Sequence, residues 1–224
     1  MKLLEQLAAR GGGCVFDCDG TLVDSEPVHA MALQTALQEH GITLSVEELV
    51  RRFAGVDNPS IIRRLNAAHG TSIGEVFLHG VEQRTLALMA SHAAPMAHAE
   101  GLLRRLARAA VPMAVASNST RPLVEAALAG AGLAGYFGDR IVSREQVARP
   151  KPAPDLYLAA AHLLKRDPRR CLAIDDSEHG VRAAVAAGMC VLGYAGRPDA
   201  AASLAQAGAH HVVSDLAQVL ELTG

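Results

Sequence analysis

The chain has no surplus of positive charge and no long apolar run. Its 224 residues include 21 lysines and arginines against 23 aspartates and glutamates, for a net charge of -2. Nucleic-acid-binding domains carry basic patches, so we expect no nucleic acid among the main partners. The longest uncharged stretches, such as AALAGAGLAGYFG (126–138), are short and rich in glycine. They predict that no helix spans or anchors in a membrane.

The sequence also lacks a Cys-x-x-Cys pair, and its first ten residues form no continuous apolar run. Three of its four cysteines lie in apolar, strand-like runs; the four are Cys14, Cys18, Cys171 and Cys190. This pattern favours buried free thiols over disulfides or a metal site. The first ten residues, MKLLEQLAAR, carry charges at positions 2, 5 and 10, so we expect no signal peptide. Together these features predict a cytoplasmic protein.

Short apolar runs recur through the second half, and each is followed by a segment with helical signals. The runs are PMAVAS (112–117), CLAID (171–175), MCVLGY (189–194) and HHVVS (210–214). Alternation of this kind is typical of a parallel sheet covered by helices on both faces. The helical signals are local: Pro154 opens one helix, Ser177 can cap another, and Gly188 stands where a helix ends. We therefore predict an α/β fold, a Rossmann-like doubly wound parallel sheet.

Residues between the first apolar run, CVFDC (14–18), and the second half contain no strand-like stretch. Four helix-like pieces fill this part of the chain: 26–41, 45–53, 58–70 and 73–92. Asn58 followed by Pro59 resembles a helix cap and its first-turn proline. We predict a small α-helical domain, residues 24–93, inserted into an α/β core made of residues 1–23 and 94–224.

Polar residues stand where three of the apolar runs end. They are Asp17 and Asp19 after the first run, Ser117 and Asn118 after the second, and Asp175 and Asp176 at the end of 171–175. In an open parallel sheet, ligands bind beyond the carboxyl ends of the strands, where the strand order reverses. Four carboxylates gathered there would repel one another unless a cation joined them. Mg²⁺ prefers oxygen ligands and keeps open positions for phosphate, so we predict a Mg²⁺ site.

Lysine is scarce, which makes one lysine informative. The chain has three, Lys2, Lys151 and Lys165, against 18 arginines. Lys151 stands between two prolines, in RPKPAP. A compact charge on a rigid loop suits the neutralisation of a carboxylate or a phosphoryl oxygen.

These residue types support phosphoryl transfer. Asp17 can attack phosphorus to form an aspartyl-phosphate, and Asp19 can protonate the leaving oxygen and then activate water. Mg²⁺, Lys151 and Ser117 would stabilise charge on the transferring group. Gly20 permits a sharp turn after the strand, and Thr21 can anchor that turn by a hydrogen bond.

Four segments resemble, in order, the four motifs of the haloacid dehalogenase-like phosphatase superfamily. They are DCDGTLVDSE (17–26), ASNS (116–119), RPKPAPDLYLAAA (149–161) and IDDSEHGVRAAVAAG (174–188). The helical insert resembles the α-helical cap of the β-phosphoglucomutase-like branch, which contains many sugar-phosphate phosphatases.

The resemblance implies a role for each matching residue. Asp17 would be nucleophile and metal ligand; Asp19 would be general acid/base and bind metal through its carbonyl. Ser117 and Lys151 would hold the phosphoryl group. Independently of the resemblance, we expect Thr21 to contact the substrate, and Asn118 either to bind phosphate by its backbone N–H or simply to start a helix. Asp176 would bind the metal directly, and Asp175 would bind it or position its water.

Two activities of this branch fit the motifs. The leading one is a Mg²⁺-dependent phosphatase for a small sugar phosphate or sugar-acid phosphate, close to the 6-phosphogluconate and 2-deoxyglucose-6-phosphate phosphatase type. The alternative is a hexose phosphomutase. His29, which would contact substrate, favours the mutase; the segment RFAGVDNPS opposes it, because Asp57 and Asn58 stand where mutases carry an arginine.

Other activities fit the sequence less well. A dehalogenase does not need a metal or Asp19, and a receiver domain has the acidic residues in the reverse order and no helical insert. For its partners we expect one small phosphorylated metabolite, and we expect a monomer or weak dimer.

Overall fold

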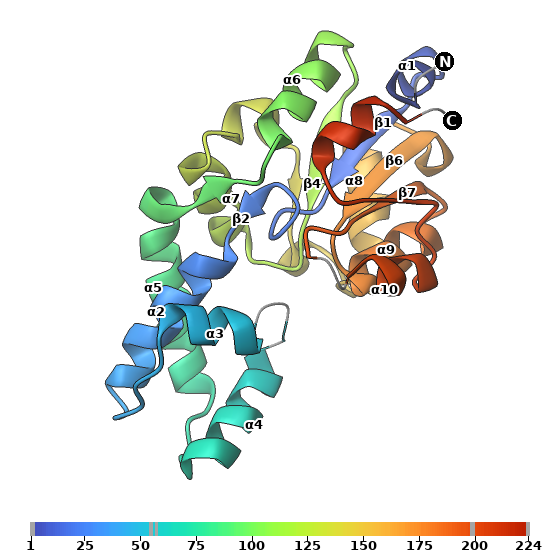
Figure 1. Cartoon of the computed structure of the whole chain (residues 1–224). Helices are drawn as coiled ribbons and strands as arrows, with labels where there is room; N and C mark the ends of the chain where they lie inside the picture. Colours follow the sequence, from blue (N-terminus) through green and yellow to red (C-terminus); the bar gives the residue numbers. More distant parts are fainter. Residues whose placement is uncertain (1–2, 54–55, 57, 198–199, 223–224) are drawn as a thin grey trace.

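The computed structural model describes residues 3–53, 56, 58–197 and 200–222. A six-stranded parallel sheet lies at its centre, in the order β5-β4-β1-β6-β7-β8 (Figure 1). The strands are β1 (Gly13–Phe16), β4 (Met113–Ala116), β5 (Ile141–Val142), β6 (Cys171–Asp175), β7 (Cys190–Tyr194) and β8 (His211–Val213). The predicted parallel sheet is confirmed. Within this sheet only β5 was not expected, because two residues are too few to show a pattern.

Helices cover both faces of this sheet. One face carries α1 (Leu3–Ala9), α6 (Ala99–Arg108), α7 (Arg121–Gly130) and the 3-10 turn Leu216–Leu220; the other carries α8 (Asp155–Leu163), α9 (Glu178–Ala186) and α10 (Ala200–Gln206). Strand β1 shows how the two cores divide. Cys14 and Phe16 pack into the first, and Val15, between them, packs into the second. Side chains alternate across a strand, so a strand buried on both faces is apolar at every position.

The helix ends follow the expected local rules. The Ser177 hydroxyl accepts a hydrogen bond from the Gly180 amide at 3.0 Å, which caps α9. Gly188 has a φ of 79° just after that helix, in the left-handed region where glycine costs least. Helix α8 begins directly after Pro154.

Residues 26–92, between β1 and α6 in the chain, form a helical insert (Figure 1). It consists of α2 (Glu26–Gln38), α3 (Val46–Phe53), α4 (Asn58–His69) and α5 (Glu75–His92), and its described residues contain no strand. The insert has an apolar core of its own, which includes Leu37, Leu49, Leu65 and Phe77. Two short antiparallel strands, β2 (Val23–Asp24) and β3 (Ala94–Pro95), connect it to the rest of the chain.

All four cysteines are free thiols, and Cys14, Cys18 and Cys171 are buried, as expected. Among the helices described, none combines the length and apolar character needed to span a bilayer.

Candidate active site

The carboxyl end of β1 is the point where the strand order reverses. Strand β1 lies between β4 and β6, and the later strands extend outward from these two in opposite directions. Asp17 follows β1, Ser117 follows β4, and Asp175 ends β6. The topology therefore gathers the polar strand ends at one edge of the sheet, as predicted.

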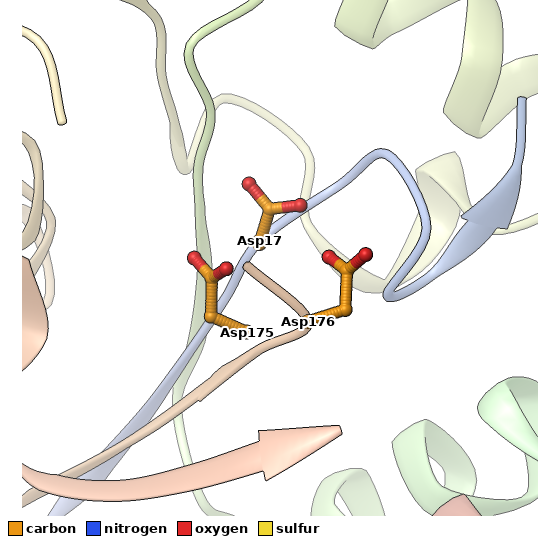
Figure 2. Close-up of side chains that lie close together, drawn as sticks. All are labelled: Asp17, Asp175 and Asp176. Carbon is orange, nitrogen blue, oxygen red and sulfur yellow. The ribbon is translucent and has the colours of Figure 1, made fainter. Parts of the chain in front are cut away.

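Three carboxylates converge at this edge. Asp17, Asp175 and Asp176 each offer an oxygen, and these oxygens all lie within 4.8 Å of one another. Figure 2 shows the three carboxylates directed toward the same region, from the ends of β1 and β6. Carboxylate oxygens at this spacing suit a hard divalent cation such as Mg²⁺. The donor set fits the predicted metal.

The protonation of these acids reflects burial and mutual repulsion. Burial raises the pKa of Asp17 well above its ordinary value; Lys151 opposes the rise, and Asp175 and Asp176 add to it. Burial, followed by the charge of Asp175, raises the pKa of Asp176 to about 7. A bound cation would favour the ionised form of both acids.

Lys151 links two of the acids. Its Nζ lies 2.5 Å from Asp17 Oδ1 and 2.8 Å from Asp175 Oδ2, and its side chain is only 3% exposed. Burial alone would lower the pKa of Lys151, but Asp17 and Asp175 outweigh it and raise the pKa. The lysine is thus a fixed positive charge beside Asp17, and not a solvated loop residue.

Asp175 is saturated with hydrogen bonds. Its Oδ2 accepts from Lys151 and from the Tyr157 hydroxyl at 2.6 Å. Its Oδ1 accepts from the Ser177 amide at 2.9 Å and the Ser177 hydroxyl at 2.8 Å. A carboxylate has about four acceptor positions, so these donors occupy all of them. Asp175 is a buried carboxyl group that fixes the position of Lys151.

Sequence reasoning missed Tyr157. Its ring lies under Lys151, with Nζ 5.0 Å from the ring centroid, and the residue is fully buried. Along the chain it reads as an ordinary apolar position of α8. The one available signal was its place in the same motif as Lys151, six residues later.

The turn after β1 anchors Asp176. The Thr21 hydroxyl donates to Asp176 Oδ1 at 2.9 Å, as part of the anchoring role expected for this threonine. Gly20 has a φ of 80°, and a Cβ built there would overlap the Asp176 carboxylate. Glycine is therefore required at this position for two reasons, the turn and the close approach of Asp176.

Asp19 lies outside the group of three carboxylates. Its Oδ2 accepts from the Ser119 hydroxyl at 2.7 Å, and its Oδ1 lies 4.0 Å from His29 Nε2, on the insert. Burial would raise its pKa, but the neighbouring side chains of His29, Ser119 and Ser25 lower the pKa of Asp19 to about 2. Burial would lower the pKa of His29, and Asp19 raises it. Asp19 thus bridges the core and the insert.

Asn118 holds the lysine loop from the next strand. Its Oδ1 accepts from the Lys151 amide at 2.9 Å, and its Nδ2 donates to the Lys151 carbonyl at 3.2 Å. Neighbouring Ser117 is buried, and its hydroxyl accepts from the Ser119 amide at 3.0 Å. The side chain of Asn118 thereby sets the position of the Lys151 backbone. The sequence pointed only to the backbone N–H of Asn118.

Part of the segment RFAGVDNPS, including Asp57, lies outside the described residues. The expectation that this segment opposes a mutase therefore stays a prediction. Six of the expected site residues form one group, joined by hydrogen bonds or by closely spaced carboxylate oxygens: Asp17, Asp175, Asp176, Lys151, Thr21 and Asn118. Asp19 and His29 lie beside this group.

Gly180→Ala is expected to damage the site selectively. A Cβ at this position of α9 would overlap the Asp175 carboxylate, so Asp175 and Lys151 must move. We expect kcat to fall by roughly 10- to 100-fold. Overpacking should also destabilise the fold by about 1–3 kcal/mol.

The matched control for that change is Gly101→Ala. Gly101 is a helical residue in α6, and a Cβ there would meet nothing within 4 Å. This variant should retain full activity and gain about 0.5–1 kcal/mol of stability. Denaturant titration and initial rates measure both. Full activity in the Gly180 variant would contradict the placement of Asp175 described above.

The chain is similar to known hydrolases in sequence and in fold. The family model for a haloacid dehalogenase-like hydrolase matches residues 12–188. The 6-phosphogluconate phosphatase of Escherichia coli strain K12 is 33% identical over 183 residues, which cover 82% of each chain. A HAD family hydrolase of Deinococcus radiodurans, solved with bound phosphate and sodium, is 34% identical with a TM-score of 0.77, over 94% of this chain and 98% of that one.

A second solved structure represents the β-phosphoglucomutase-like branch. A putative β-phosphoglucomutase of Thermotoga maritima aligns with a TM-score of 0.78 and 26% identity, over 93% of this chain and 96% of that one. The matched segment holds every motif and the whole insert. The chain belongs to the haloacid dehalogenase-like hydrolase family.

Proposed function

We propose that this chain, a phosphatase by its family and relatives, is a Mg²⁺-dependent enzyme that acts on a small sugar phosphate or sugar-acid phosphate through an aspartyl-phosphate on Asp17. One observation supports it above the others: buried Lys151 touches Asp17 within a cluster of three carboxylates. A relative named 6-phosphogluconate phosphatase favours the substrate class.

The first half-reaction uses Asp17 as the nucleophile. A carboxylate oxygen of Asp17 forms a bond to phosphorus while the bond between phosphorus and the ester oxygen breaks. Asp19 gives a proton to the departing oxygen. Lys151, already fixed next to Asp17, balances negative charge on the phosphoryl oxygens.

The second half-reaction reverses the proton transfer. Asp19, now ionised, takes a proton from water, which attacks phosphorus and releases Asp17 and inorganic phosphate. The pKa of Asp19 is about 2 in the free chain, so the proton that Asp19 gives in the first half-reaction must enter with the substrate, whereas the second half-reaction uses the ionised form that is already present. Its hydrogen bond from Ser119 keeps it close to the loop after β4.

Asp17, Asp176 and the Asp19 carbonyl would hold Mg²⁺, because hydrogen bonds already saturate Asp175. When bound, Mg²⁺ neutralises and orients the phosphoryl oxygens. Asp175 instead keeps Lys151 in place. Thr21 orients Asp176 through its hydroxyl.

Residues 24–93 would form the cap domain, which selects the substrate, and residues 1–23 and 94–224 the catalytic core. The separate apolar core of the insert and the two-stranded connection at β2 and β3 support this division. His29 extends from the insert to Asp19 and would contact the substrate at this boundary.

The test is phosphate release by the purified chain with Mg²⁺ across several dozen phosphorylated metabolites. We expect turnover of sugar phosphates or sugar-acid phosphates, with free phosphate as a product. The mutase alternative draws support from His29, and it predicts an isomer, no free phosphate and a need for a bisphosphate activator. No phosphate release from any sugar phosphate would refute the proposal.

A further inference from the structure

The insert is attached to the core along α7 at two places of different character. The first is a close backbone crossing. A Cβ built on Gly130, at the end of α7, would overlap the Met89 carbonyl oxygen of α5 and lie 3.2 Å from the backbone of Ala90. Only glycine permits this approach, so the two helices are locked by shape at this crossing.

The second attachment is polar and lies at the other end of α7. Glu82 Oε1, on α5, accepts from the Thr120 hydroxyl and from Arg144 Nη2, each at 3.4 Å. The Glu82 and Arg144 side chains are 32% and 49% exposed. We call Glu82, Thr120 and Arg144 the clasp.

The core half of the clasp belongs to the loops that build the active site. Thr120 directly follows Ser119, whose hydroxyl holds Asp19. The Arg144 amide donates to the Ser119 carbonyl at 3.4 Å, which joins the loops after β4 and β5. Glu82 therefore connects the insert to the segment that positions Asp19.

The Thr120 hydroxyl donates to Glu82 and does not cap its own helix. It stands at the N-cap of α7, where a threonine hydroxyl usually accepts a bond from the helix's own amide. No such bond forms; the hydroxyl donates to Glu82, and the Arg121 amide is satisfied by Glu145 at 2.8 Å. The capping interaction is replaced by a contact between insert and core.

We infer that the clasp is a releasable attachment of the insert, in addition to the contact of His29 with Asp19, and that its opening and closing set how tightly substrate is retained. The inference rests on the proposed function. The crossing at Gly130 depends on close contact between two backbones. The exposed ion pair between Glu82 and Arg144 is much weaker, and changes the ratio of closed to open insert by only about 1.4- to 5-fold. Such a contact can break on each catalytic cycle while the crossing at Gly130 acts as the pivot.

Hydrogen–deuterium exchange on the free full-length chain tests the clasp without substrate. Glu82→Gln removes the charge with little change of shape. We expect amides of residues 117–121 and 143–146 to exchange about 1.4- to 5-fold faster than in the unaltered chain. The charge-swapped pair Glu82→Arg with Arg144→Glu should restore protection. Unchanged exchange in the single variant, or no restoration in the swap, overturns the inference.

Glu39→Gln is the matched control. Glu39 pairs with Arg84 of α5 at 2.6 Å, with similar exposure, but both residues lie within the insert. Its loss should leave exchange at 117–121 and 143–146 unchanged. Faster exchange there in this control would show a general loosening of α5 and overturn the role of the clasp.

A kinetic arm separates the clasp from the proposed activity. We expect Glu82→Gln to raise KM by up to about fivefold, with kcat within about twofold, since a smaller closed fraction weakens apparent affinity by the same factor. Faster exchange with an unchanged KM refutes the gating. Faster exchange in a chain that hydrolyses no phosphate ester refutes the proposed function and leaves the clasp as a structural contact.

Discussion

Asp17→Asn is expected to lower phosphate release by more than about a thousandfold, because an amide cannot replace the attacking carboxylate. The loss should appear in kcat at saturating substrate. Folding should be preserved, since Lys151 keeps its partner Asp175 at 2.8 Å and one of three crowded carboxylates becomes neutral. We expect a melting temperature within about 4 °C of the unaltered chain.

Asp139→Asn provides the control for this charge removal. Asp139 is an exposed residue just before β5 and belongs to none of the four motifs. It should have unchanged kcat and KM in a continuous phosphate-release assay. Turnover by the Asp17 variant above about one-hundredth of the normal rate would contradict Asp17 as nucleophile.

Removal of divalent cations is expected to have the second largest effect. Treatment with a chelator should reduce phosphate release at least about a hundredfold, because the phosphoryl charge and the carboxylate cluster then lack their counter-ion. Mg²⁺ added back should restore the rate in a saturable way. Isothermal titration with Mg²⁺ alone measures binding independently of turnover.

Two variants test how Asp176 contributes to the binding of Mg²⁺. Asp176→Asn should raise the Mg²⁺ concentration needed for half-maximal rate by roughly 10- to 100-fold, as expected for a direct ligand or its close partner. Thr21→Val should raise it less, because Asp176 loses only the 2.9 Å hydrogen bond that orients it. Full activity in the presence of excess chelator would refute metal dependence.

The arrangement explains how four acids can share one edge of the sheet. Asp175 is neutralised by Lys151 and by donors from Tyr157 and Ser177. Asp19 is directed to Ser119 and His29. Asp17 and Asp176 remain as the pair best placed for a cation. Repulsion is reduced because every acid has at least one hydrogen-bond donor or positive charge beside it, with Lys151 shared by Asp17 and Asp175.

Much of the core was predictable from local patterns. All five expected strands are present, because strands buried on both faces are apolar at every position. Ser177 caps the start of α9 and Gly188 follows its end, as expected, since capping depends on a few adjacent residues. Strand β5 and the short strands β2 and β3 were not anticipated, because pairs of residues acquire strand geometry only from their neighbours.

The sequence by itself determined the fold class and which acids, lysine and hydroxyl residues stand at the ends of strands, because both depend on residue type and spacing along one chain. Only the tertiary structure decided which hydrogen bonds and ion pairs those groups form. Tyr157 and Ser177 saturate Asp175, Asn118 clamps Lys151, and Glu82 joins the insert to the loop beside Asp19. These contacts join residues from different strands and helices, and a hydrogen bond between distant segments depends on where the packed backbones bring their atoms together.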